Sequence, residues 1–420
     1  MTMSFKLPYW LAAPLWAWMA GAGAAPLGFD DALTRALQET PALSASASRI
    51  AAARQSAIPA GALPDPQLTL GLANVPIDGA DRFSLDSEPM TMRMIGVMQA
   101  FPNAAKRGAR AGAARGRIGL AEAGMRVVRQ TVLRQTAQAW IRRHTAEAQL
   151  QHIAALYDEN RLFDAAVRAR LAGGGGMASD VVLPHEEAAL IAGREDALNA
   201  RRAQAIASLR QWIGDAADWP LAGTPPQWPI DHAGLAHRLE QHPELALYGH
   251  EARVLDAETD LARAATRPDW RLGVVYQQRG SQFTNMAGIE LGFDLPVFAS
   301  TRQRPLIAAR VAERAALDAD YQARLRAHTA ELDADLAEYR RLDRALARQN
   351  EVLLPLAQEK VTLVLAAWRG GQGSLTELIG ARRARIDAEL KAIELAGARD
   401  EMAARLHFTY AQPDESGVQP

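Results

Sequence analysis

The 420-residue sequence contains no cysteine. This absence excludes disulfide bonds, and it also excludes a lipid anchor on an N-terminal cysteine. An excess of either charge is missing too, because 47 basic and 48 acidic residues give a formal net charge of −1. No global electric field is available to recruit nucleic acid, so we expect no nucleic-acid partner.

Long hydrophobic runs are also missing beyond the first residues. In segment 1–24, Lys6 precedes an apolar run from Trp10 to Met19 and the small residues Ala22-Gly23-Ala24. This order is typical of a secretory signal peptide, and we expect cleavage after Ala24. A run of about 14 apolar or small residues is too short to cross ~30 Å of hydrocarbon as a helix. We therefore expect an exported protein in which any membrane span consists of strands.

The sequence does contain a long internal repeat. Corresponding residues keep their order and spacing: Leu37, Pro41, Leu43 and Pro66 in the first copy, and Leu239, Pro243, Leu245 and Pro268 in the second. The unit is much longer than the ~20–50 residues of a solenoid repeat. We divide the chain into a signal peptide (1–24), a first unit (25–214), a Pro-rich linker (215–231), a second unit (232–410) and a disordered tail (411–420).

Each unit contains a short helical region, two strand-like runs and two long helical runs. The short helices are predicted over 29–57, with a break near Pro41, and over 232–265. The long runs cover 103–171 and 300–367, and after glycine clusters at 173–176 and 370–373 they continue to 213 and 407. At ~1.5 Å per residue, a run of about 65 to 70 residues extends ~100 Å.

Apolar residues at every seventh position predict coiled-coil packing of these helices. In the second unit they are Leu325, Leu332, Tyr339, Leu346 and Leu353. The first unit keeps the same step with the smaller residues Val132, Ala139, Ala146 and Ile153.

Alternation with a period of two predicts strands near 67–73, 90–99, 270–277 and 288–295. In the last of these, Ile289 and Leu291 lie on an oily face, while Glu290 and Asp294 lie on the opposite face and are candidates to line a lumen. The methionines at 90, 92, 94 and 98 also share a face. Thioethers can bind Cu(I) or Ag(I), but we interpret these methionines as oily-face residues that point into lipid.

The number of strands and the order of the predicted elements indicate a family resemblance. Four strands cannot close a barrel, so the chain must oligomerise. The duplicated order of strand pair, long helix, glycine-rich tip and returning helix resembles the TolC family of outer-membrane efflux channels. Pro64-Asp65-Pro66, Gln99-Ala100-Phe101-Pro102 and Lys106-Arg107 are similar to the CzcC/CusC heavy-metal branch, although the Pro-Gly that usually precedes Lys-Arg is replaced here by Ala104-Ala105.

The resemblance implies an α+β membrane protein. Its duplicated units of two barrel strands and long coiled-coil helices would assemble as a homotrimer, with a 12-stranded β-barrel in outer-membrane lipid and an α-helical tunnel in the periplasm. It implies two further partners, a periplasmic adaptor (membrane fusion) protein and an inner-membrane RND pump. It also places the adaptor contacts at the tips, at Gly173, Gly176, Ser179, Gly371, Gly373 and Ser374, and a gate acid at Glu377.

Enzymatic chemistry is not expected. His232, His237, His242 and His250 are not spaced as an i, i+4 ligand pair, and we interpret them as solvated. Neither a G-x-S-x-G motif nor a P-loop is present. We therefore expect no catalytic residues, no cofactor and no resident metal.

The sequence favours a passive outer-membrane channel of a tripartite system for heavy-metal cations. Two alternatives remain open at this stage. One is a drug-efflux or type I secretion channel of the same fold, and the other is a soluble periplasmic coiled-coil adaptor.

Overall fold

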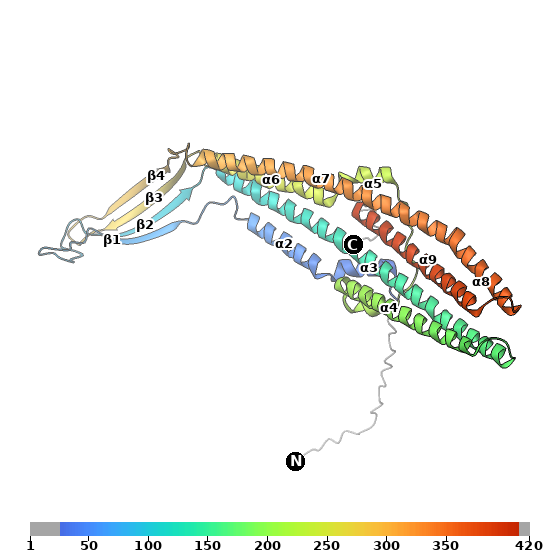
Figure 1. Ribbon diagram of the computed structural model, residues 1–420. Helices are drawn as coiled ribbons and strands as arrows, with labels where there is room; N and C mark the ends of the chain where they lie inside the picture. Colours follow the sequence, from blue (N-terminus) through green and yellow to red (C-terminus); the bar gives the residue numbers. More distant parts are fainter. Residues whose placement is uncertain (1–25, 411–420) are drawn as a thin grey trace, which may run out of the picture.

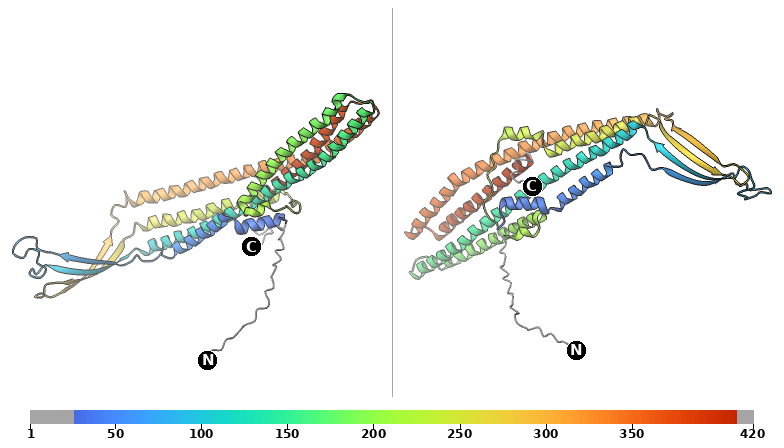
Figure 2. Two further views of the ribbon diagram at one scale, coloured as in Figure 1. Left: turned by 90° about the horizontal axis from the view of Figure 1, so that it is seen from below. Right: turned by 180° about the vertical axis from the view of Figure 1, so that it is seen from behind.

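The molecule is elongated and consists of a four-stranded sheet followed along its length by a set of long helices (Figure 1). The computed structural model describes residues 26–410; the predicted signal peptide (1–24) and tail (411–420) lie outside the described residues. The sheet occupies one end, and two helical hairpins end together at the other (Figure 2).

Both halves of the chain contain two short helices, two strands and two long helical runs in the same order, and in the second half a π turn divides the first long run into α7 and α8. The first half contains α1 (Phe29–Glu39), α2 (Pro41–Ala57), β1 (Gln67–Ala73), β2 (Met92–Phe101), α3 (Ala104–Ala172), the 3-10 turn η1 (Ala178–Val181) and α4 (Val182–Ile213). After a second 3-10 turn, η2 (Gly214–Asp218), the second half contains α5 (His232–Leu239), α6 (Pro243–Ala264), β3 (Asp269–Gln278), β4 (Met286–Asp294), α7 (Gln303–Arg348), the π turn η3 (Gln349–Leu353), α8 (Leu354–Arg369) and α9 (Leu375–Tyr410). This parallel supports the proposed duplication.

Prolines set the breaks in the short helices. Pro41 begins α2 and Pro243 begins α6, each at the first helical position. Proline has no N–H to donate, and the first turn of a helix does not need one. The break predicted near Pro41 is therefore confirmed.

The long helix α3 packs against its neighbours through small side chains. Val132, Ala139, Ala146 and Ile153, the predicted seventh-position residues, are all buried. Glycines allow α6 to approach closely, because a Cβ on Gly116 would lie only 3.0 Å from Val254 Cγ2. None of the helices between residues 26 and 410 is both long and apolar enough to cross a membrane.

The second coiled-coil run differs from the prediction in one place. Leu332 and Leu346 are buried, but Leu353 is 52% exposed. The sequence predicts an unbroken helix over 300–367, whereas the structure has the π turn η3 at Gln349–Leu353. Pro355 explains the interruption, because its ring clashes with the carbonyl of residue 351 and a wider turn relieves the clash.

The segment predicted as a linker packs against the helices. Trp228 lies against Phe29 and Phe408, with ring centroids 5.6 and 5.8 Å away. The buried guanidinium of Arg143 donates to the carbonyl of Ala217 at 2.6 Å. The connection between the halves is therefore part of the core around Trp140, which is fully buried.

The sheet joins the two halves through its two inner strands. Its order is β1-β2-β3-β4, every pair is antiparallel, and β2 pairs with β3. Within residues 26–410, β1 and β4 each have a strand on one side only. Both edges of the sheet are therefore open in a single chain.

A polar cluster fixes the start of α3 against the start of β3. The Asn103 side chain accepts a hydrogen bond from the backbone N–H of Lys106 at 2.9 Å and so caps α3. Its amide nitrogen donates to Asp269 Oδ1 at 2.9 Å and to the carbonyl of Ala264 at 3.1 Å. Asp269 also pairs with the Lys106 ammonium. One asparagine thus connects α3, α6 and β3.

We predict that Asn103→Ala lowers the free energy of unfolding by ~1–2 kcal/mol, because the helix loses its N-cap and the amide contacts are lost. Asn103→Ser is the matched variant: it keeps a capping oxygen but loses the amide donor, so its effect should be intermediate. Thermal unfolding in detergent measures both variants. Equal stability of the alanine variant and the parent protein would contradict this account.

Candidate channel surfaces

One face of the sheet is apolar and exposed in all four strands. Its apolar positions are Leu68, Leu70, Leu72, Ile95, Val97, Trp270, Leu272, Val274, Tyr276, Ile289, Leu291 and Phe293. Arg93, Gln99 and Gln278 lie on the same face near the ends of their strands. Ile289 is 78% exposed. Such a continuous apolar surface is typical of contact with lipid or with another apolar surface.

The opposite face carries small and polar residues, including both predicted lumen acids. Glu290 pairs with Gly273, and Asp294 pairs with Asp269. The two acids differ in their surroundings: Arg271 Nη1 lies 3.3 Å from Asp294 Oδ1, whereas Glu290 has no ion-pair partner among residues 26–410. Glu290 therefore contributes an uncompensated negative charge to this face.

The methionines of β2 lie on this small and polar face, and the prediction that they occupy the oily face is wrong. Met94 pairs with Gly71 and Gln277, and Met98 pairs with Gln67 and Gly273. The oily positions of β2 are Ile95 and Val97. Alternation alone identifies two faces, but the register with β1 and β3 decides which face is apolar.

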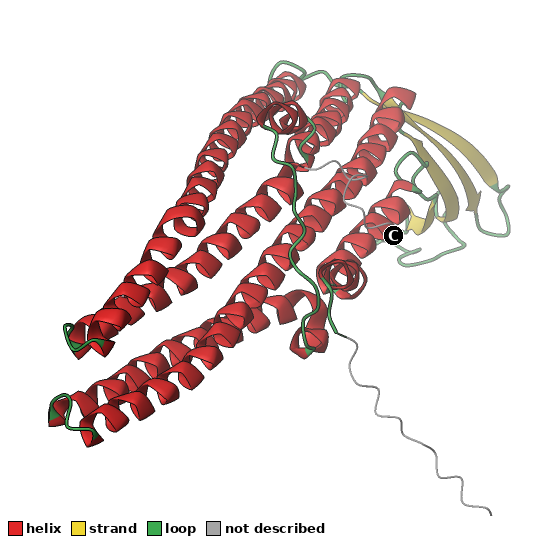
Figure 3. Cartoon of the chain, turned by 90° about the vertical axis from the view of Figure 1, so that its right-hand side faces the viewer, coloured by secondary structure: helices red, strands yellow, loops and turns green. Residues whose placement is uncertain are grey.

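The predicted tip residues form two turns at the end of the molecule farthest from the sheet (Figure 3). Gly173, Gly176 and Ser179 lie between α3 and α4, and Gly371, Gly373 and Ser374 lie between α8 and α9. Gly176 and Gly371 have φ angles of 98° and 78°, a region that favours glycine. Their role in adaptor binding remains a prediction.

Glu377, the predicted gate acid, is exposed in the first turn of α9. Its carboxylate accepts a hydrogen bond from the Ser374 N–H at 3.3 Å, and Ser374 Oγ accepts one from the Glu377 N–H at 3.1 Å. This is a capping box, and the Ser-x-x-Glu spacing in the sequence was a signal for it. Glu377 therefore has a structural role whether or not it gates a channel.

Aromatic and ionic contacts hold the two hairpins together just inside the tips. The Arg170 guanidinium of α3 lies over the Trp368 ring of α8, 4.6 Å from its centroid. Arg382 of α9 lies over Phe163 of α3 at 4.5 Å and 3.5 Å from the Glu159 carboxylate. These contacts fix the relative position of the two predicted tip surfaces within one chain.

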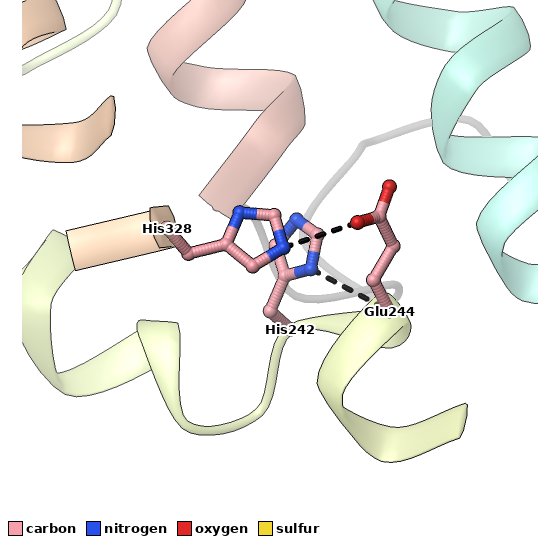
Figure 4. A group of neighbouring side chains, drawn as sticks. All are labelled: His242, Glu244 and His328. Atoms are coloured by element: carbon pink, nitrogen blue, oxygen red, sulfur yellow. Dashed lines mark hydrogen bonds and ion pairs between the residues drawn. The ribbon is translucent and has the colours of Figure 1, made fainter. Parts of the chain in front are cut away.

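A buried polar cluster lies midway along the helices, where His242, Glu244 and His328 meet (Figure 4). His242 caps α6, with Nδ1 accepting from the Glu244 N–H at 3.2 Å. The His328 ring of α7 packs against it, with ring centroids 4.3 Å apart and ring planes inclined by 43°. The expectation of a solvated histidine is wrong for His242, which is 3% exposed. Its partner is 86 positions away, so spacing within one helix could not reveal the pair.

The contacts of Glu244 favour an ion-pair network at this cluster. Arg324 Nε donates to Glu244 Oε2 at 3.0 Å, and His328 Nε2 lies 3.1 Å from the same oxygen. The His328 hydrogen bond, together with Arg324, lowers the pKa of Glu244 to about 2 although partial burial opposes the shift. Two imidazoles and a carboxylate are ligand types for a transition metal, but a guanidinium on the same oxygen repels a cation.

Three features together define the class of fold: the open sheet, the ~100 Å helices and the two hairpin tips that lie side by side. The fold is that of a TolC-like outer-membrane channel. Residues 32–215 match the model of the outer membrane efflux protein family. No curated protein sequence gives a significant match.

Solved structures match nearly the whole chain. A membrane protein from Pseudomonas aeruginosa shares 17% identity, with a TM-score of 0.78 and coverage of 98% of this chain and 97% of that chain. CusC shares 17% identity, with a TM-score of 0.76 and coverage of 92% and 93%. The open state of the Neisseria gonorrhoeae outer-membrane channel MtrE shares 17% identity, with a TM-score of 0.75 and coverage of 91% and 88%.

At this level of identity, the neighbours establish the fold and leave the transported substrate open. The family is one of efflux proteins, and MtrE is a channel. These comparisons support the TolC-like assignment and the expectation that the chain is not an enzyme. They do not distinguish the heavy-metal branch from other efflux channels.

We predict that the pH dependence of stability changes in the variant His242→Asn. Burial, together with nearby His328, lowers the pKa of His242 from 6.5 to about 4. The unfolded chain then binds more protons than the folded chain between these values, so stability is lost as the pH falls from 6.5 towards 4, by up to ~3 kcal/mol. Asparagine keeps an N-cap acceptor and does not titrate.

Thermal unfolding at pH 7, 6 and 5 tests this assignment, because Glu244 titrates only at lower pH. The decrease in Tm should be smaller in His242→Asn than in the parent protein. His232→Asn is the control, since His232 has a side chain that is 52% exposed. Identical pH profiles for the His242 variant and the parent would exclude this role of His242.

Proposed function

We propose that the protein is the outer-membrane channel of a tripartite efflux system and works as a homotrimer. Three copies would pool twelve strands into one barrel in the outer membrane, and their long helices would form a tunnel in the periplasm. The observation that carries the proposal is the open sheet with one continuous apolar face. An open strand edge in lipid leaves backbone groups without hydrogen-bond partners, and further copies of the sheet provide those partners.

The helical part supports the same arrangement. α3 has 69 residues and begins three positions after β2 ends at Phe101. A helix of this length spans ~100 Å, which suits a duct that extends from the membrane into the periplasm. The proposed contacts for a periplasmic adaptor are the glycine turn at the far end of α3, before α4, and the turn between α8 and α9. The adaptor would connect the channel to an inner-membrane RND pump.

Heavy-metal cations are the proposed substrate. Two features support them: the uncompensated carboxylate of Glu290 on the face that would line the barrel, and the resemblance of Pro64-Asp65-Pro66 and Lys106-Arg107 to the CzcC/CusC branch. Carboxylates in a pore attract cations. The channel itself would be passive, and the pump would supply the energy.

We predict that the protein is extracted from cells only with detergent, as a trimer, and that it forms conducting pores in planar lipid bilayers. A soluble periplasmic adaptor would instead be released without detergent, because it would have no lipid-facing sheet. Chemical cross-linking and bilayer conductance measure the two properties. A detergent-free soluble fraction without pore activity would exclude the channel.

We predict that deletion of the gene increases sensitivity to at least one of copper, silver, zinc, cobalt and cadmium, and that a plasmid copy reverses the effect. The readout is the minimal inhibitory concentration of each salt. If sensitivity rises only towards organic drugs, or export of a protein is lost, the same fold serves the alternative substrates and the metal proposal is wrong.

We predict that Glu377→Gln increases single-channel conductance or weakens block by divalent cations, if the acid narrows the tunnel of the trimer. Glutamine can keep the capping box, so this variant removes the charge and preserves the helix start. Asp180→Asn is the matched control, because Asp180 is the acid of the other tip and accepts from the Met177 N–H at 2.9 Å. Unchanged conductance together with unchanged block by divalent cations in Glu377→Gln would exclude a gating role.

A further inference from the structure

The methionines are concentrated in the sheet. Of the 11 methionines in the sequence, Met92, Met94, Met98 and Met286 lie in strands. The pairing of Met94 with Gln277 and of Gln277 with Met286 places β2 and β4 methionines on one face. This is the small and polar face, so contact with lipid does not explain these side chains.

Glycines on the neighbouring strands lie beside two of these methionines, which are half-buried. The methyl carbon of Met94 lies 3.4 Å from the position that a Cβ on Gly71 would occupy. Met98 and Glu290 lie on either side of Gly273, with Met98 Cε 3.9 Å and Glu290 Cβ 3.6 Å from the corresponding position there. The glycines thus leave room for a thioether and a carboxylate to lie over the same strand.

The distances between the methionines suit a series of weak cation-binding sites along the sheet. Met92 and Met94 are two residues apart, so their Cα atoms are ~6.8 Å apart, and adjacent strands are ~4.8 Å apart. Among the described residues, the Met94 sulfur has one polar contact, with Gln277 Nε2 at 3.9 Å. Glu290 lies across Gly273 from Met98 and adds a negative charge there.

Thioethers are soft, neutral ligands that select ions such as Cu(I), whereas hard ions such as Mg²⁺ prefer oxygen. Aliphatic side chains could fill the same volume as these methionines without a sulfur atom. If the methionines only filled space, replacing them with aliphatic residues would not change ion binding. The chain has no cysteine, so thiols cannot account for any soft-metal binding by this protein.

We propose that Met94 and Met98, together with Met92 and Met286, form a thioether surface that binds soft monovalent cations inside the barrel. The proposal rests on the proposed function, because that function makes the small and polar face the lining of a pore. Glu290 would raise the local cation concentration, and the thioethers would select the soft ions among them.

The test uses Ag⁺ as the probe, in chloride-free buffer, with the full-length mature trimer. In planar bilayers, Ag⁺ should block or modulate the current, and the double variant Met94→Leu/Met98→Leu should require a roughly tenfold higher Ag⁺ concentration for the same effect. Leucine is close to methionine in volume, so the fold should be retained. Met125→Leu/Met402→Leu, which changes two methionines outside the sheet, should behave like the parent protein.

Ag⁺ binding to the detergent-solubilised trimer, measured by calorimetry, gives a second readout that does not need conduction. Loss of binding in the sheet variant alone supports the thioether surface. Equal Ag⁺ affinity in the parent protein and the sheet variant overturns it, and so does an equal loss in the control variant. Absence of pores in bilayers, with the difference in Ag⁺ binding intact, would instead contradict the channel function and leave the binding surface supported.

Discussion

An open four-stranded sheet is the constraint on which the rest of the structure depends. The pairing of β2 with β3 joins the two halves of the chain, while β1 and β4 each have one edge without a neighbour in the part of the chain that the structure describes. Under the proposed function the sheet lies in hydrocarbon, where each unpaired backbone group costs several kcal/mol, and further copies of the sheet would pair with both edges. The sheet also sets the position of the long helix α3. This helix starts three positions after β2 ends, and the Asn103 cluster fixes its first turn against β3.

The two halves share a framework and differ on the face where we place the pore lining. If the match between Phe101-Pro102 and Leu295-Pro296 is extended along the strands, Met94 and Met98 of β2 correspond to Gly288 and Gly292 of β4. Large and small side chains thus alternate around the proposed barrel. Glu290 corresponds to Gly96 in the same alignment, so the acid is also present in one half only. A duplicated framework permits these differences because the backbone pairing does not depend on them.

Sequence periodicity predicted most of the fold and less of the site. Period two located the strands, and the seventh-position residues such as Val132 and Ile153 are buried as expected. Periodicity within one strand does not reveal the register between strands. The prediction therefore places the methionines of β2 on the apolar face, whereas they lie on the small and polar face. The contact between His242 and His328 depends on how α6 and α7 pack, which no local pattern records. The capping role of Glu377 can be predicted from the Ser374-x-x-Glu377 spacing, which is that of a capping box.

The electrostatics of the proposed lining favour passage over retention of a cation. Arg271 compensates Asp294 at 3.3 Å and Lys106 pairs with Asp269, so Glu290 is the one acid of this face without an ion pair among residues 26–410. A single carboxylate per chain raises the local cation concentration without forming a multidentate hard-metal site, which would need several oxygen ligands. Neutral thioethers add selectivity without adding charge. Because conduction requires binding sites that are weak enough to release the ion, a face with one free acid and several thioethers suits a duct better than a storage site.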